Sequence, residues 1–322
     1  MYSQKFNYFH GIMFHHFHDD KIHKCGQGSI SKEDFINIIN YIGRKNIINA
    51  DEFYLKSIEN KLNENEVCLT FDDGIKCQHD IALPVLDDQK IKAFFFVYSS
   101  LFDGSPDLLE VYRYFRINYF SNIDEFYNFF FSMIDSDLDK FFLKNNCTIS
   151  NNSKKFPHYS INDVKFRLVR DMLLTSQEYE LLMFKIFDKY EFDPELYYKR
   201  LFMSIEDLKN IDSNEHIIGL HSHSHPTLME NLTFNEQYTE YNKNRDVLSK
   251  ILKKDKSDFK CMSHPCGSYN EDTKSVLNEL GVKLGFKQIM TLEKEKKMKK
   301  LNNSSVEIAR QDHADIMSMM QK

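Results

Sequence analysis

Val67-Cys-Leu-Thr-Phe-Asp-Asp-Gly74 is the stretch of sequence that decides the fold. A short β-prone, mostly apolar run ends abruptly in two carboxylates and a glycine, which is typical of a buried strand that runs into a turn. A helix is expected from there to about Leu86, and Ala93–Tyr98 has the composition of another buried strand. This strand–helix–strand order favours parallel pairing, and the residues that follow each strand then gather at one edge of the sheet.

The same alternation is found on both sides of this unit. A first strand within residues 8–18 and a helix over 31–43 precede it, and strands are expected at Ile217–Leu220, Phe259–Ser263 and Lys283–Phe286. From about residue 103 to 200 the pattern changes to aromatic residues at helical spacing, such as Phe126 and Phe130. We therefore expect an α/β protein with a mostly helical insertion over 103–200, in which the polar stretch 144–155 forms a loop.

Composition excludes several classes of protein. The 322 residues include 42 basic and 48 acidic residues, and the net charge of −6 argues against a protein that coats nucleic acid. No apolar run reaches the roughly 18 residues of a membrane-spanning helix. The first residues contain no uninterrupted apolar segment, and none of the six cysteines forms a Cys-x-x-Cys motif. These features predict reduced thiols and a cytoplasmic protein without a transmembrane segment.

Asp72 and Asp73 form the first candidate site. Two adjacent carboxylates at a strand end point in different directions, so one can hold a metal ion while its neighbour serves as a base. The alternative is an ordinary turn, because Asp and Gly are common turn residues.

His221-Ser-His-Ser-His225 forms the second candidate site. Three histidines in five residues are difficult to explain by packing, and neutral imidazole suits zinc and similar metals. Pro226 disfavours a helix through His225, since the residue before proline avoids the α region. A strand end that turns brings His221 and His225 to one ion, whereas an extended segment places all three histidines on one face.

His264-Pro-Cys-Gly-Ser-Tyr-Asn270 is the third candidate site. Pro265 and Gly267 flank Cys266 and predict a tight loop whose backbone amides could face a ligand. A thiol nucleophile at Cys266 is conceivable, although a turn with an incidental cysteine is the preferred interpretation. One aspartate and two histidines would leave open positions on zinc, which is the pattern of a catalytic site and implies hydrolysis of an amide or ester.

These three motifs, in this order, make the sequence similar to the polysaccharide deacetylase family (carbohydrate esterase family four). The resemblance implies a distorted (β/α) barrel of about seven strands, formed by residues 1–102 and 201–322. It implies Asp72 as general base and a divalent metal, most often zinc, bound by Asp73, His221 and His225. It further implies that the backbone amide of Cys266, between Pro265 and Gly267, helps to bind the oxyanion of the substrate.

Several positions depart from the family pattern. Many members have an arginine that tethers the base near the start of the third motif, where this chain has Ser263. Arg310 is the expected substitute, and we also place it among the residues near the substrate. No clear copy of the usual acid motif exists, so His313 is the first candidate for the acid and His264 the second. His15 lies in a segment that resembles the Tyr-His lead-in of some members and is expected to line the substrate site.

The sequence therefore predicts a metal-dependent hydrolase that removes an N-acyl group, acetyl or formyl, from an amino sugar in glycan or sugar biosynthesis. The sugar would be free, nucleotide-linked or lipid-linked, no nucleic acid is expected as a partner, and a homo-oligomer is possible. A sugar O-deacetylase and a non-catalytic carbohydrate-binding or assembly protein on the same scaffold are the alternatives. A purely structural zinc protein is disfavoured, because structural sites normally use four protein ligands.

Overall fold

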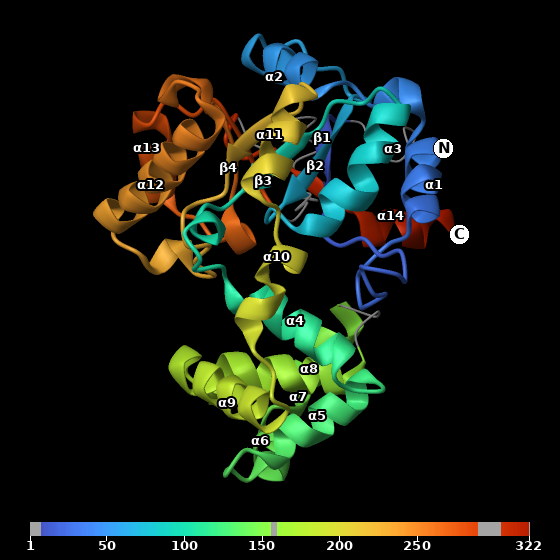
Figure 1. Ribbon diagram of the computed structural model, residues 1–322, viewed down its shortest axis with the longest axis vertical. Helices are drawn as coiled ribbons and strands as arrows, with labels where there is room; N and C mark the ends of the chain where they lie inside the picture. Colours follow the sequence, from blue (N-terminus) through green and yellow to red (C-terminus); the bar gives the residue numbers. More distant parts are fainter. Residues whose placement is uncertain (1–7, 156–159, 289–303, 322) are drawn as a thin grey trace. The chain divides into compact units, whose positions relative to one another are not determined.

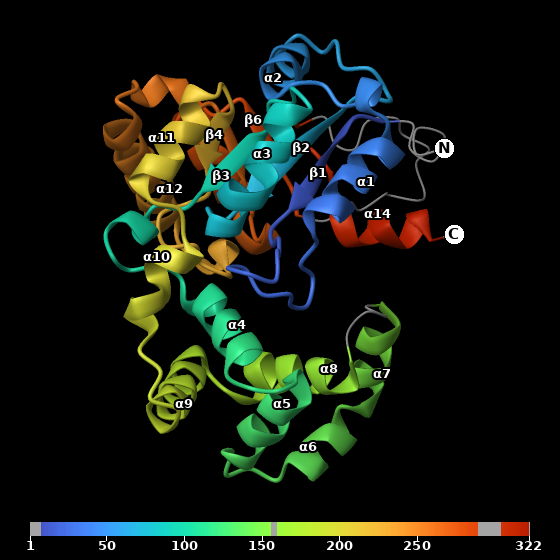
Figure 2. The same ribbon diagram turned by 45° about the vertical axis from the view of Figure 1, so that its right-hand side comes forward.

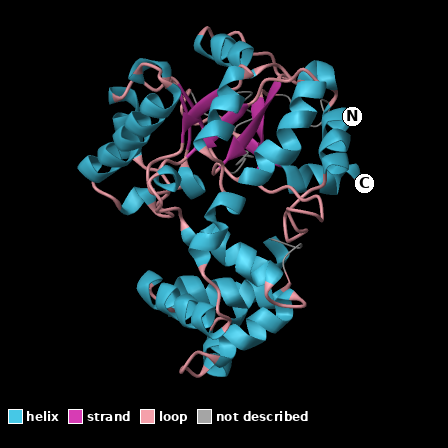
Figure 3. Cartoon of the chain, in the orientation of Figure 1, coloured by secondary structure: helices cyan, strands magenta, loops and turns pink. Residues whose placement is uncertain are grey.

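The computed structural model describes residues 8–155, 160–288 and 304–321. The chain divides into two compact units. We call Met1–Asp107 with Lys199–Lys322 the barrel unit, and Leu108–Tyr198 the helical unit. Figure 3 shows the strands in the barrel unit alone, while the described part of the helical unit consists of helices and their connections.

Seven parallel strands form the barrel, in the order β6-β5-β4-β3-β2-β1-β7. A further parallel bridge joins Phe286 on β6 to Ile308, just before β7, so the sheet nearly closes on itself. This arrangement confirms the expected distorted (β/α) barrel of about seven strands. The strands are β1 His10–Phe14, β2 Val67–Asp72, β3 Phe94–Val97, β4 Ile217–Leu220, β5 Cys261–Ser263, β6 Leu284–Phe286 and β7 Arg310–Asp312.

Alternation along the strands separates the inside of the barrel from its outside. On β3, Phe94 and Phe96 belong to an inner cluster with Cys68 and Phe286, whereas Phe95 packs in the outer core against the helices. Because side chains alternate between the faces of a strand, Thr70 and Asp72 lie on the same inward face as Cys68. The last residue of β2 therefore points into the barrel at its carboxyl end.

Helices surround the sheet of the barrel unit (Figures 1 and 2). Several begin with the capping boxes that their sequences indicate, such as Ser31 with Asp34 and Ser204 with Asp207. No helix of the described residues is both long and apolar enough to cross a membrane. The helices of this unit are α1 Lys32–Ile42, α2 Ala50–Ile58, α3 Leu83–Asp88, α11 Ile205–Ser213, α12 Phe234–Leu252, α13 Glu271–Glu279 and α14 His313–Met320, and the short α10 Tyr198–Leu201 begins at the junction of the units.

The helical unit packs around aromatic side chains, as the helical spacing of its phenylalanines indicates. Phe126 and Phe130 of α5 are fully buried. The expected loop over 144–155 is wrong: α7 occupies most of this stretch, and its buried Ile149 packs against Val164 and Leu168. One well-placed apolar residue thus outweighs a polar composition. The helices are α4 Leu108–Asn118, α5 Ile123–Ser132, α6 Leu138–Lys144, α7 Asn146–Lys155, α8 Ile161–Leu168 and α9 Ser176–Lys189.

Candidate metal centre and active site

The turn after β2 separates the two adjacent carboxylates. Asp72 ends the strand on its inward face, whereas Asp73 and Gly74 both adopt positive φ angles, 77° and 67°. The left-handed region disfavours a side chain such as that of Asp73 by roughly 1–2 kcal/mol, so the surrounding contacts must hold this residue in place. A Cβ atom at Gly74 would lie 3.0 Å from Cγ1 of Val97, so a larger residue would strain both the backbone and this contact.

Asp73 meets two histidines from the end of β4. Its Oδ1 atom lies 3.1 Å from Nε2 of His221 and 3.4 Å from Nε2 of His225. One ligand atom of each residue lies within 4.8 Å of the others, which suits three ligands of one divalent cation. Burial would raise the pKa of Asp73, but its hydrogen bond to His221 and the nearby His225 and His15 lower it.

The other nitrogen of each imidazole faces an acceptor. His221 Nδ1 donates to the carbonyl oxygen of Ser263 at 2.8 Å, and His225 Nδ1 donates to Oδ2 of Asp107 at 2.7 Å. Because Nδ1 of each ring donates to an acceptor, Nε2 is the nitrogen that faces Asp73, and it would bind a metal ion once the ion displaces any proton there. Asp107 was not among the predicted site residues, because it lies outside the three motifs that the sequence analysis singled out.

The segment between the two histidines turns, as one of the two expected geometries requires. Ser222 and His225 have φ angles of 63° and 57°. The middle histidine, His223, points elsewhere and its Nδ1 lies 2.8 Å from Oγ of Ser99. Glu240 on α12 accepts the amide protons of His223 and Ser224, so the adjacent helix holds the turn in place.

Asp72 has entirely different partners. Arg310 of β7 donates from Nη1 to Oδ1 and from Nη2 to Oδ2 of Asp72, both at 2.7 Å, and Ser263 Oγ lies 3.1 Å from Oδ2. Burial would raise the pKa of Asp72, but the charge of Arg310 holds it below its ordinary value. Asp72 is therefore ionised at neutral pH, and it does not belong to the group of three metal ligands. Both properties are those required of a general base.

Arg310 reaches Asp72 across β1. Gly11 pairs with Arg310, and a Cβ atom at Gly11 would lie 3.0 Å from Cγ of Arg310, so the glycine makes room for the arginine. The guanidinium also donates to the carbonyl oxygen of Lys287 and to Oγ1 of Thr70, and the side chain is buried. The geometry thus favours the expected contact with the base, while a direct contact between Arg310 and substrate stays a prediction.

The structure brings His15, which was expected to line the substrate site, near the metal-ligand cluster. His15 follows β1, its Nε2 atom lies 3.9 Å from Oδ2 of Asp73, and its side chain is 21% exposed. The nitrogens of His313 lie 3.3 Å from the carbonyl oxygen of Met13 and 3.1 Å from that of Gly28, and burial lowers its pKa. An acid role for His313 stays a prediction, and this geometry favours His15 instead.

His264, the second candidate for the acid, is also held by its surroundings. It is buried, its Nε2 donates to the carbonyl oxygen of Val306 at 2.9 Å, and burial lowers its pKa to about 3. The loop that follows it buries Pro265 and exposes Cys266, which has a φ angle of 51°. Gly267 follows with a φ angle of 71°, so the tight loop expected around the cysteine is present beyond the end of β5.

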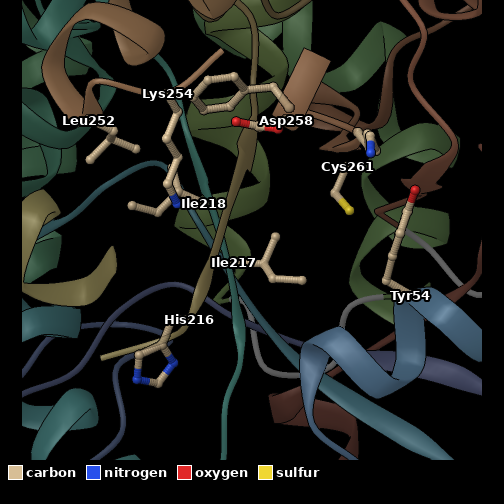
Figure 4. Close-up of a pocket in the computed structure, with 10 residues that line it drawn as sticks. Tyr54, His216, Ile217, Ile218, Leu252, Lys254, Asp258 and Cys261 are labelled. Atoms are coloured by element: carbon tan, nitrogen blue, oxygen red, sulfur yellow. The ribbon is translucent and has the colours of Figure 1, made fainter. Parts of the chain in front are cut away.

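A pocket elsewhere in the barrel unit is not part of this site. It opens at the amino ends of β4 and β5, where His216, Ile217 and Cys261 line it together with Tyr54 (Figure 4). The metal-ligand cluster lies beyond the carboxyl ends of β2 and β4, at the opposite edge of the sheet. In (β/α) barrels the carboxyl edge carries the chemistry, and the amino edge mainly contributes to stability.

Comparisons with known proteins agree with this geometry. A profile of the family described as Polysaccharide deacetylase matches residues 59–116 and 189–285. A comparison with curated proteins finds no match.

Solved structures share the fold. The deacetylase PplD from Streptococcus pyogenes, solved in complex with acetate, has a TM-score of 0.57 and 14% identity, with 98% of each chain covered. IcaB from Ammonifex degensii has a TM-score of 0.53 and 13% identity, covering 94% of this chain and 91% of its own. The polysaccharide deacetylase BC0361 from Bacillus cereus has a TM-score of 0.51 and 12% identity, covering 98% of this chain and 70% of its own. At such identities the likeness to these structures is one of fold alone, whereas the match of the family profile places the chain in the polysaccharide deacetylase family.

Proposed function

We propose that this protein is a metal-dependent hydrolase that removes an N-acyl group, acetyl or formyl, from an amino sugar in glycan or sugar biosynthesis. The observation that carries the proposal is the division of labour between Asp72 and Asp73. Asp73 and two histidines form the group of metal ligands. Asp72 lies next to this group, is ionised and is bound by Arg310. A pure binding protein has no need of a tethered base next to its ligand.

The donor set fits a divalent cation, and we propose zinc, because imidazole and carboxylate ligands suit it. A cation held there would polarise the acyl carbonyl and lower the pKa of a nearby water molecule. Asp72 would take the proton of the attacking water, a role that Arg310 supports by keeping the carboxylate ionised. His15 would donate a proton to the leaving amine, and the loop at Cys266 would face the developing oxyanion.

A panel of N-acetyl and N-formyl amino sugars, free, nucleotide-linked and lipid-linked, together with O-acetylated sugars, tests the proposal. Release of acetate or formate is measured with zinc-loaded and chelated protein. Asp72→Asn should lower kcat by about 10²–10⁴-fold with the metal still bound, since general base catalysis contributes that much. His221→Ala should lose the metal as well, and His223→Gln is the matched control within the same motif.

The outcomes separate the alternatives. If the panel is turned over and Asp72→Asn leaves the rate unchanged, the assignment of the base is wrong. If the protein binds zinc and sugar but releases no acid from any substrate, the non-catalytic carbohydrate-binding alternative is favoured. Release of acetate from O-acetylated sugars alone would favour the O-deacetylase. A cytoplasmic location and a homo-oligomer stay predictions.

A further inference from the structure

A second group of metal-ligating side chains lies in the loop between β1 and α1. His18, Asp20 and Cys25 each offer one ligand atom, and these atoms lie within 4.8 Å of one another. We call these three residues the loop cluster. Within the described part of the chain it is the one group of this kind besides Asp73, His221 and His225. The proposed hydrolase has no use for it, so the histidine-rich segment after β1 contains more ligands than the reaction needs.

Hydrogen bonds around His18 define the form of its ring. Ser29 Oγ donates its own proton to the carbonyl oxygen of Gly26 at 2.7 Å. The contact of 2.9 Å between Ser29 Oγ and His18 Nδ1 therefore needs the proton of the imidazole. His18 thus carries its proton on Nδ1, and the lone pair of Nε2 is available to a metal ion. Metal-binding histidines are usually oriented in this way by a second hydrogen bond.

The other two ligands are linked to each other. Asp20 has a φ angle of 57°, and its Oδ1 atom accepts the amide proton of Cys25 at 3.3 Å. This contact brings the thiol of Cys25 next to the carboxylate, across the four residues that separate them in the sequence. Cys25 is exposed, so its proton can leave to water when a metal binds.

The loop is anchored to the barrel unit on both sides. Ile22 accepts a hydrogen bond from Nη2 of Arg200 at 2.8 Å through its carbonyl oxygen, and His23 Nε2 lies 2.9 Å from Oδ2 of Asp80. The amide of His18 donates to the carbonyl oxygen of Ile30 at 3.0 Å. A metal ion would meet ligands that are already near one another, so binding would cost less conformational entropy than binding by a flexible loop.

We propose that the loop cluster binds one Zn²⁺ ion, separate from the cation of the active site. A thiolate, an imidazole and a carboxylate form a ligand set that zinc accepts and that magnesium and calcium, which prefer oxygen alone, do not. Binding deprotonates the Cys25 thiol, and the proton passes to solvent. The ion links residues 18 and 25 and so clamps the loop that begins at His15.

Cobalt spectroscopy distinguishes the two sites, because only the loop cluster contains sulfur. The full chain, stripped of metal, is titrated with Zn²⁺ and with Co²⁺ as the spectroscopic probe. The wild type should bind two equivalents and show a thiolate-to-cobalt charge-transfer band. Cys25→Ser should lose this band and one equivalent, whereas Cys147→Ser, which removes another exposed cysteine, should keep both. Asp73→Asn should keep the band, so the active-site metal can fail without affecting this result.

Thiol alkylation gives a second measurement on the unmodified protein. Zn²⁺ should slow alkylation of Cys25 at least tenfold and leave Cys147 unaffected, and His18→Ala should abolish the protection. This readout remains available if Cys25→Ser fails to fold. A wild type without the cobalt band, a band that persists in Cys25→Ser, or equal alkylation rates with and without Zn²⁺ would each overturn the proposal.

Discussion

Arg310→Met is the substitution that most directly tests how the base is held. The guanidinium makes two contacts of 2.7 Å with Asp72, and both groups are buried. Hydrogen bonds to charged groups contribute about 1.5–3 kcal/mol each, and breaking a buried ion pair by removing one partner costs about 3–5 kcal/mol. We therefore expect the free energy of unfolding at neutral pH to fall by about 3–5 kcal/mol.

The substitution should also change the pH dependence. In the wild type, Arg310 holds the pKa of Asp72 below its ordinary value, so the stability from the pair is present above pH ~4 and lost as the pH falls through the lowered value. Without Arg310, the largest contribution that opposes burial is lost, so the pKa of Asp72 rises. The folded variant then takes up a proton at higher pH than the folded wild type does, so the stability difference between the two should narrow on acidification. The acid limb of kcat should move to higher pH for the same reason.

Denaturant unfolding at several pH values and pH–rate profiles measure both effects. Arg310→Lys keeps the charge without the bidentate geometry and should lie between wild type and Arg310→Met. Arg170→Met, which removes a more exposed pair with Asp171 in the helical unit, should cost less than about 1 kcal/mol. If Arg310→Met unfolds like the wild type and its acid limb does not move, the tether does not hold the base.

Three further predictions follow from contacts in the barrel unit. Asp107→Asn should weaken zinc binding about 10–100-fold, because the carboxylate that orients His225 is lost, whereas the control Asp103→Asn should bind zinc as the wild type does. Competition with a chelator measures the zinc affinities, and equal affinities for both variants would contradict the prediction. Gly219→Ala should destabilise the fold by about 1–3 kcal/mol, since its Cβ atom would lie 2.6 Å from the ring of Phe96, and an unchanged Tm would contradict this. The free energy of unfolding should decrease from pH 6.5 to about pH 4, because the unfolded chain binds protons that buried histidines with a lowered pKa do not bind in the folded chain. Each such histidine contributes up to about 1.4 kcal/mol per pH unit. Calorimetry that shows a flat profile would contradict this prediction. The most strongly lowered pKa values are those of His10 and His216, at about 4, and of His264, at about 3.

Parallel strands made much of the architecture predictable from sequence. Asp73 and His221 were expected near each other because each follows a buried apolar run, and parallel pairing brings such ends to one edge. The positions of residues outside the repeating pattern were not predictable. Asp107 orients His225 from a loop, and no periodicity fixes the path of a loop. Neither does the sequence tell which way a ring such as that of His313 turns.

The contact between Arg310 and Asp72 joins one of the first strands to be synthesised to the last. A chain still emerging from the ribosome, or one clipped by a protease ahead of residue 310, holds its carboxylate without a counter-ion. Such a chain would keep its metal ligands but hold Asp72 without the guanidinium that keeps it ionised, so an active base would report that β7 had taken its place beside β1.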